Sequence, residues 1–171
     1  MLGRHTGFTI IELMLVMVII GILAVIGLHQ FKLFKYRSHR TEALVNLDGI
    51  RTHELAHAAE EGFFYTASWC PDTTPGTVPH DWERGTNFDK LGFKPQGKVY
   101  YVYGIGGYPG NGVDDPYWID EPQDSVAPAV DKKHNIAMEA RGDINGNGVE
   151  NHLLLTEEPP GEVLNMNSTE Y

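Results

Sequence analysis

Residues 7–28 read GFTIIELMLVMVIIGILAVIGL, and this stretch decides the fold. Its only charged residue is Glu12, near its start. Residues 8–28, which we call the apolar segment, would rise about 31 Å as a helix, enough to cross the hydrocarbon core of a bilayer. A carboxylate inside such a helix costs roughly 2.5–3.5 kcal/mol on insertion scales, so Glu12 is expected to need a partner. The stretch therefore predicts a membrane-spanning helix that carries a functional carboxylate.

The residues around the start of this segment form an ordered pattern: the short leader MLGRHTG, which ends in Gly7, then Phe8, then Glu12. The pattern resembles the class III signal of type IV prepilins. The resemblance implies that prepilin peptidase cleaves after Gly7 and N-methylates Phe8, so that the apolar segment stays on the mature protein. It also implies that Glu12 pairs with the amine of Phe8 in a neighbouring subunit. An ordinary signal anchor with a stray glutamate is the alternative.

Two features depart from the family pattern. Many type IV pilins carry a helix-bending proline where this chain has His29, so a straighter helix is expected here. Only Arg4 precedes the segment in the leader, whereas Lys32, Lys35 and Arg37 follow it. The positive-inside rule would place that basic flank in the cytoplasm. The family resemblance implies the reverse orientation, which we adopt.

Composition limits the remaining organisation. A chain of 171 residues has room for one membrane segment and one small globular domain. The net charge of −10 argues against non-specific binding of nucleic acid by the whole domain, although a role toward nucleic acid is left open. The single cysteine, Cys70, cannot form an intrachain disulfide, and we expect it to be half-buried beside Trp69.

We expect an α+β fold in which a long N-terminal helix packs on a small antiparallel β-sheet. The predicted parts are a leader at 1–7, a transmembrane or filament-core helix at 8–29, an amphipathic half of the helix at 30–62, and a head at 63–171. On a helical wheel Leu44, Leu47, Leu55 and Ala58 share one side, which we expect to be buried. Gly62 is expected to end the helix.

The rest of the chain is expected to be loop and strand. Residues 66–96 predict a long loop, and the alternation at 98–103 predicts a strand. Residues 104–128 are expected to be irregular. Strands are predicted at 134–140 and 149–156, joined by a turn at GDINGNG, and an edge strand at 161–165.

Two patterns raise the question of a metal. His53 and His57 belong to an HExxH sequence, in which a zinc hydrolase would use the intervening Glu54 as general base. The two histidines are predicted to lie opposite the apolar stripe. Exposed histidines that bind metal only adventitiously are the expected case, and we do not expect an enzyme.

The second pattern resembles half of a calcium loop: Asp143, Asn145 and Asn147 stand at alternate positions before Gly148, with Asn151 further on. The bidentate glutamate expected at the end of such a loop is replaced by Leu154. An Asn-Gly turn explains the same residues without a metal. Asp114, Asp115 and Asp120 are a further candidate calcium cluster.

The resemblance thus implies a structural subunit of a type IV pilus-like filament that serves adhesion, twitching motility or DNA uptake. A minor pilin or a type II secretion pseudopilin is the alternative, and a membrane-anchored zinc hydrolase is a remote one. The implied partners are other pilins, prepilin peptidase, an inner-membrane assembly platform and, before assembly, the lipid bilayer. The head would lie in the periplasm first, and the filament would be extracellular or, for a pseudopilus, periplasmic.

Overall fold

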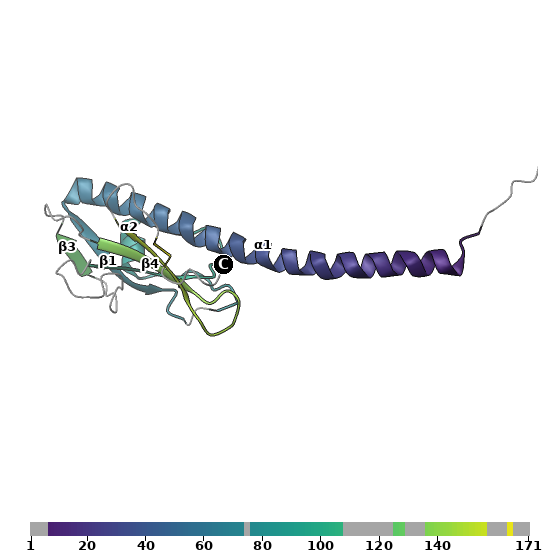
Figure 1. Cartoon of the computed structure of the whole chain (residues 1–171). Coiled ribbons are helices and arrows are strands. Elements are labelled where there is room, and N and C mark those ends of the chain that lie inside the picture. The colour runs from purple at the N-terminus through teal and green to yellow at the C-terminus, as the bar shows by residue number, and fades with distance from the viewer. Residues whose placement is uncertain (1–6, 74–75, 108–124, 129–135, 157–163, 166–171) are drawn as a thin grey trace, which may run out of the picture.

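A computed structural model of the chain describes residues 7–73, 76–107, 125–128, 136–156 and 164–165. One helix, α1 (Ile10–Glu61), dominates the shape (Figure 1). Its first half projects away from the rest of the molecule, and its second half lies along the head. The helix is continuous through His29, in line with the absence of proline at that position.

Local chemistry sets both ends of α1. Thr9 is the N-cap, and its side chain accepts a hydrogen bond from the backbone N–H of Glu12. Gly62 ends the helix in the left-handed conformation, at φ 79°, and its N–H donates to the carbonyl of Ala58 at 2.9 Å. The predicted stop at Gly62 is confirmed, because a left-handed C-cap favours a residue without a Cβ.

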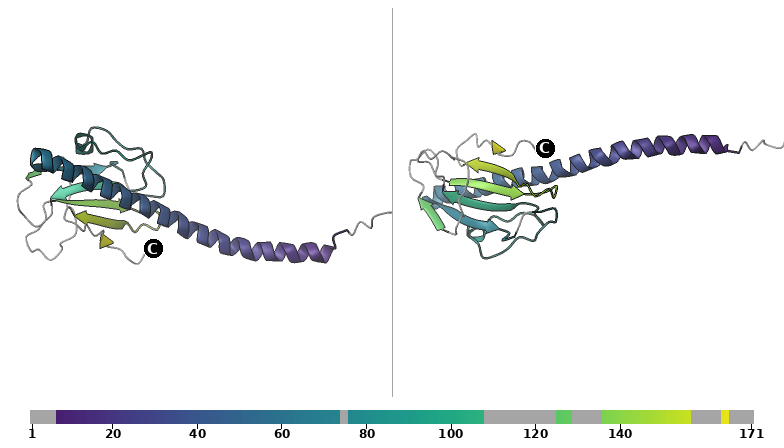
Figure 2. Two further views of the ribbon diagram at one scale, coloured as in Figure 1. Left: turned by 90° about the horizontal axis from the view of Figure 1, so that it is seen from above. Right: turned by 60° about the horizontal axis from the view of Figure 1, so that its bottom comes forward.

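The head is built on a six-stranded sheet whose neighbouring strands are all antiparallel, in the order β3-β1-β2-β4-β5-β6. Its strands are β1 (Phe63–Cys70), β2 (Val102–Gly107), β3 (Ser125–Pro128), β4 (Ile136–Gly142), β5 (Asn151–Thr156) and β6 (Leu164–Asn165). A short helix, α2 (Asn87–Leu91), lies between β1 and β2 in sequence. The second half of α1 lies across one face of this sheet (Figure 2). The predicted α+β arrangement is confirmed.

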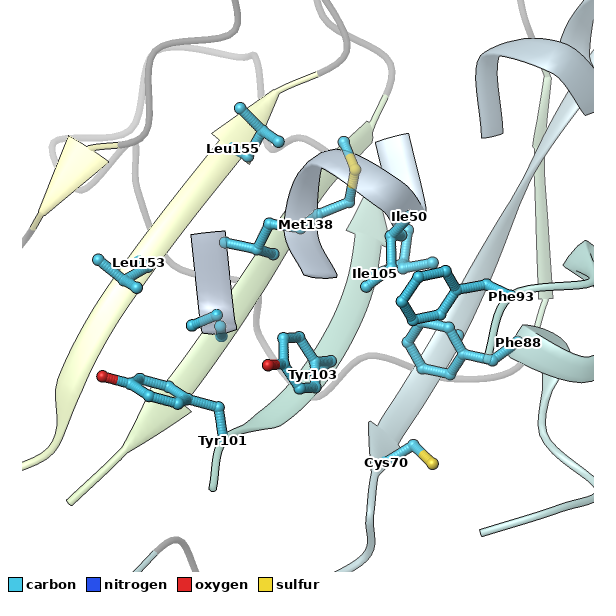
Figure 3. Packing of buried hydrophobic residues seen from close by; sticks show 14 of the residues in the cluster. Ile50, Cys70, Phe88, Phe93, Tyr101, Tyr103, Ile105, Met138, Leu153 and Leu155 are labelled. Carbon is cyan, nitrogen blue, oxygen red and sulfur yellow. The ribbon is translucent and has the colours of Figure 1, made fainter. Parts of the chain in front are cut away.

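The core lies between α1 and the sheet. Figure 3 shows side chains from both layers pointing toward one another, among them Ile50 of α1, Tyr103 and Ile105 of β2 and Met138 of β4. Phe88 of α2 and the following Phe93 add an aromatic edge to this cluster. The head thus buries aliphatic and aromatic side chains without a disulfide, since Cys70 is a free thiol.

The buried face of α1 differs from the predicted one. Ala43, Leu47, Ile50 and Glu54 are buried, whereas Leu55 is 39% exposed. Leu47 was placed correctly, and Leu44 and Ala58 are partly buried against the core, but the centre of the buried face is turned by roughly a fifth of the helix circumference. Because Glu54 occupies a core position, the buried face of α1 contains a carboxyl, which interrupts its apolar pattern in the sequence.

Several predicted boundaries are also wrong. Residues 66–96 were expected to be a loop, but they contain most of β1 and all of α2. The strand expected at 98–103 begins at Val102, and β2 continues into residues expected to be irregular, which also contain β3. Before it, Val99 forms only an isolated bridge with His80. The turn between β4 and β5 is confirmed, and β6 falls within the predicted edge strand.

Candidate functional site

The start of α1 brings together the residues that the sequence singled out. Gly7 and Phe8 precede the helix and are exposed, with Phe8 at 76%. Thr9 accepts from the Glu12 N–H at 3.3 Å, and its hydroxyl lies 3.5 Å from the Glu12 carboxylate. The bond from the Glu12 N–H is the first half of a capping box, for which Thr9-x-x-Glu12 is the sequence signature, whereas the carboxylate contacts the Thr9 hydroxyl. The bond between Gly7 and Phe8 therefore lies in accessible, non-helical chain directly before a well-defined helix.

The Thr9 cap was not predicted from the sequence, although the signature Thr9-x-x-Glu12 was legible. It gives Glu12 a local role, since a carboxylate near a helix N-terminus is stabilised by the helix dipole. Within the part of the chain that the structure describes, no cationic side chain forms an ion pair with Glu12. Roles for Gly7, Phe8 and Glu12 in cleavage and assembly stay predictions.

The helix surface beyond Glu12 is apolar on every side. The large hydrophobic side chains between Ile10 and Leu28 are each at least 45% exposed. This part of α1 is long and apolar enough to cross a membrane, and none of its most apolar window is buried in the molecule. Soluble monomers rarely expose so large an apolar surface, so lipid or protein is required to cover it.

The HExxH residues do not converge on one open site. His53 is exposed and packs edge-on against Phe93, whereas the half-buried His57 lies against Phe63 and Tyr65. Glu54 is fully buried and accepts a hydrogen bond from the Tyr65 N–H at 3.1 Å. Burial raises the pKa of Glu54 to about 8, although the Tyr65 N–H opposes this shift. Glu54 is a core carboxyl here, without access to a water on a metal held by the two histidines.

The proposed calcium loop satisfies its own backbone. The Asp143 carboxylate accepts from the N–H groups of Gly146, Asn147 and Gly148 at 2.8, 3.2 and 3.0 Å. The side-chain oxygen of Asn145 accepts from the Asn147 N–H at 2.9 Å. The same oxygens that would bind calcium thus hold the turn, and calcium binding stays a prediction.

The other metal candidates add little. Asn151 is buried at the start of β5. Among the described residues, no three or more His, Cys, Asp or Glu side chains are grouped to hold a metal ion. Asp114, Asp115 and Asp120 lie outside the described residues.

A buried ionic cluster on β4 and β5 was not foreseen. Glu139 is 1% exposed, and its carboxylate contacts Arg141 Nε at 2.8 Å and His152 Nδ1 at 2.6 Å. The Arg141 guanidinium also lies over the ring of Trp69, 4.2 Å from its centroid. Burial by itself would raise the pKa of Glu139, but His152 and Arg141 together hold it below its usual value. The cross-strand pairing of Arg141 with His152 that creates this cluster appears only once the strand register is known.

Cys70 is fully buried rather than half-buried. Burial raises its pKa to about 11, and its thiol lies 3.8 Å from the carbonyl oxygen of Glu83. A thiol in this state is a poor nucleophile, which agrees with a packing role in the core (Figure 3).

Comparison with known proteins bears on the N-terminal region. A family model for the prokaryotic N-terminal methylation motif matches residues 2–28. The type IV major pilin protein PilA of Myxococcus xanthus (strain DK1622) is 45% identical over 58 residues, which are 34% of this chain. The match spans about a quarter of that relative's length (26%). No solved structure matches the chain significantly. The resemblance is confirmed for the region that matches: residues 2–28 carry the prokaryotic N-terminal methylation motif, and part of the chain is similar to a type IV major pilin.

Proposed function

We propose that the mature chain is a structural subunit of a type IV pilus-like filament. Prepilin peptidase would cleave between Gly7 and Phe8 and methylate the new amine of Phe8. The single observation that carries this proposal is the exposed apolar half of α1, which has Glu12 as its only charge and an accessible Gly7–Phe8 bond directly before it. The methylation motif at residues 2–28 supports the same processing.

The exposed apolar half of α1 suggests how such a subunit would pass from the membrane into a filament. Before assembly, the apolar segment would span the inner membrane with the head in the periplasm. After cleavage, the Phe8 amine would lie about one helical turn from Glu12 of its own chain and would be free to pair with Glu12 of a neighbour. The apolar helices would then bundle in the filament interior, where each covers surface that lipid covered before.

Glu12 would set the register of that bundle. A charged carboxylate among apolar helices is costly without a partner, so a subunit that slips out of register would leave two opposite charges unpaired. The subunits would enter the filament through an inner-membrane assembly platform. Adhesion, twitching motility and DNA uptake are all open as the filament's task.

Mass spectrometry of the chain from peptidase-competent cells tests the processing. The expected product begins at Phe8 and carries an N-methyl group. An unprocessed leader in those cells would refute the proposal.

Three variants separate assembly from helix capping. Thr9→Ala removes only the capping hydroxyl, Glu12→Gln removes the charge but keeps a side chain that can cap, and Glu12→Ala removes both. We expect the two Glu12 variants to lose filaments and Thr9→Ala to keep them. Equal loss in all three would assign Glu12 to capping alone.

The abundance of the chain in sheared surface filaments separates the remaining alternatives. A filament composed mainly of this chain indicates a major pilin. Trace amounts indicate a minor pilin, and filaments confined to the periplasm indicate a secretion pseudopilin.

A further inference from the structure

Four cationic residues follow the apolar segment on α1, and we call Lys32, Lys35, Arg37 and Arg40 the basic collar. No acidic residue occurs between Glu12 and Glu42, so nothing in this stretch of sequence offsets their charge. The collar lies before Ala43, the first residue of α1 that is buried against the head. It therefore occupies the junction between the apolar segment and the head.

Three of the four collar side chains are available to an outside partner. Lys32, Lys35 and Arg37 are exposed, whereas Arg40 is half-buried and its Nε atom is buried. Within the described residues, no collar side chain forms an ion pair. Some cations of the head are paired instead, as with Lys98, whose Nζ lies 2.9 Å from the Asp81 carboxylate.

The spacing places the collar at the depth of lipid headgroups. From Leu28, the end of the apolar segment, the helix rises about 6 Å to Lys32, 10 Å to Lys35 and 14 Å to Arg37. The headgroup layer on each side of a bilayer is roughly 5–8 Å thick. Helical side chains lean toward the helix N-terminus, which here is the membrane end, so the long cationic side chains reach back toward that layer.

Two aromatic residues strengthen the comparison with a membrane interface. Phe31 and Phe34 alternate with the cations and are 65% and 71% exposed. They extend the apolar surface past Leu28 into the first turns of the basic collar, and Lys and Arg side chains at the end of an apolar helix typically reach toward the headgroups.

The cations spread over more than half of the helix circumference rather than forming one stripe. At about 100° per residue, Lys35, Lys32 and Arg37 point in directions spread over roughly 200°. A single protein surface would meet only part of this arc, whereas headgroups meet a spanning helix from all exposed sides. Burial, together with the charge of Lys35, lowers the pKa of the neighbouring His39, which agrees with a positive potential here.

We propose that the basic collar binds the anionic headgroups of phospholipids in the leaflet on the head side of the membrane. This inference rests on the membrane-inserted stage of the proposed function. The lipid contacts would hold α1 at a fixed depth before assembly and would have to be broken when the subunit leaves the bilayer. Membrane charge would thus influence how readily the subunit is extracted.

The test uses the purified full chain in neutral detergent, titrated with phosphatidylglycerol or with phosphatidylcholine. Native mass spectrometry counts the lipids bound per chain. Each cation near an anionic surface contributes roughly a five-fold gain in affinity, so the variant Lys32→Gln/Lys35→Gln/Arg37→Gln should lose about 100-fold of its preference for phosphatidylglycerol. The matched control Arg84→Gln/Lys90→Gln/Lys94→Gln removes three exposed cations from the head and should keep it.

The outcomes are distinct. Preference for phosphatidylglycerol that is lost in the collar variant and in high salt, but kept in the control, supports the proposal. Equal binding of the two lipids, or equal loss in both variants, overturns it. Self-association that disappears in the collar variant, without any lipid preference in the wild type, would instead assign the collar to an acidic surface of a second copy. Because the assay requires neither cleavage nor methylation, its failure is separate from a failure of the pilin proposal.

Discussion

Glu54 offers a quantitative test of the packing between α1 and the sheet. Its side chain is fully buried on the face of α1 that covers β1, where the Tyr65 N–H donates to it at 3.1 Å. Burial raises its pKa from 4.5 to about 8. The carboxyl is therefore protonated in the fold at pH 7, while the unfolded chain ionises at its ordinary value.

The sign of the pH dependence follows from that difference. Between pH 4.5 and about 8 the folded state binds more protons than the unfolded state at this site. The free energy of unfolding therefore falls as the pH rises through this window, and the loss is complete above about 8. At 1.36 kcal/mol for each unit of pKa, the loss is at most about 5 kcal/mol.

Glu54→Gln removes the titration and keeps an acceptor for the Tyr65 N–H. We expect the variant to match the wild type near pH 5 and to exceed it by about 3–5 kcal/mol at pH 8.5. Urea unfolding of the full chain in neutral detergent, followed by the fluorescence of Trp69 and Trp82, measures this difference. Comparing the two proteins at each pH cancels the histidines that both share.

Glu60→Gln is the matched control, because it removes an exposed carboxylate from the same helix. It should leave the pH profile of the wild type unchanged. A wild-type stability that is flat from pH 5 to 8.5, or a Glu54→Gln profile parallel to it, would refute the reasoning.

Three further predictions concern the head. A Cβ added at Gly142 would lie 2.7 Å from the Tyr101 ring, so Gly142→Ala should lower the free energy of urea unfolding by about 1–3 kcal/mol. The control Gly76→Ala places its methyl group in open space and should change that free energy little. Equal effects of the two variants would contradict the close contact at Gly142. Cys70 should react with iodoacetamide at pH 8 only after urea unfolds the head, because the thiol is buried and its pKa is raised to about 11. Rapid labelling of the folded chain would exclude this burial. Asp143→Ala should lower the melting temperature even in EDTA, because the backbone N–H groups of Gly146 and Gly148 lose their acceptor. An effect that vanishes in EDTA would show that calcium, not the turn, holds the loop.

The helix was the most predictable part of the fold. Residues 13–28 are apolar without interruption, and Gly62 stands where a left-handed cap is needed, so both the membrane-length segment and the end of α1 follow from local chemistry. The turn between β4 and β5 was equally legible, because Asn and Gly at 145–148 tolerate the backbone that a tight loop requires.

The head was less predictable because its decisive contacts are distant in sequence. The sequence FFYTASWC has the aromatic and β-branched content of a strand, yet the Pro- and Gly-rich residues after it led to its assignment as loop. Pairing with β2 and β3, which lie some 40 and 60 residues later, makes it a strand. In the same way, Glu54 broke the apolar pattern of α1 because its partner, Tyr65, belongs to another element.

In the candidate site, too, features set by neighbouring residues were predictable, whereas features that depend on a distant partner were not. Gly7, Phe8 and Glu12 are recognisable because they lie close together in sequence, and the cap between Thr9 and Glu12 depends on one helix end alone. Their proposed partner is another copy of the chain, so a single chain contains only half of the interaction. The candidate calcium loop was ambiguous for a different reason. The Asp143 and Asn145 side-chain oxygens that suggest a metal are the ones that accept the backbone hydrogen bonds of the turn.

Three carboxyls of this chain lie at positions removed from water or predicted to be so, and they meet the cost of charge in different ways. Glu54 retains its proton, because the core offers it one backbone N–H and no cation. Glu139 ionises, because burial is outweighed by His152 and Arg141 beside it. Among the described residues the Glu12 carboxylate is contacted only by the Thr9 hydroxyl, which is less than Glu139 has, yet Glu12 stands in the segment predicted to enter lipid. A charged Glu12 in that setting requires a cation from outside its own described chain, and cleavage before Phe8 would create one at the same end of every neighbouring subunit. The cost of burying an unpaired charge, which keeps Glu54 protonated, would thus favour pairing of Glu12 with a neighbouring subunit.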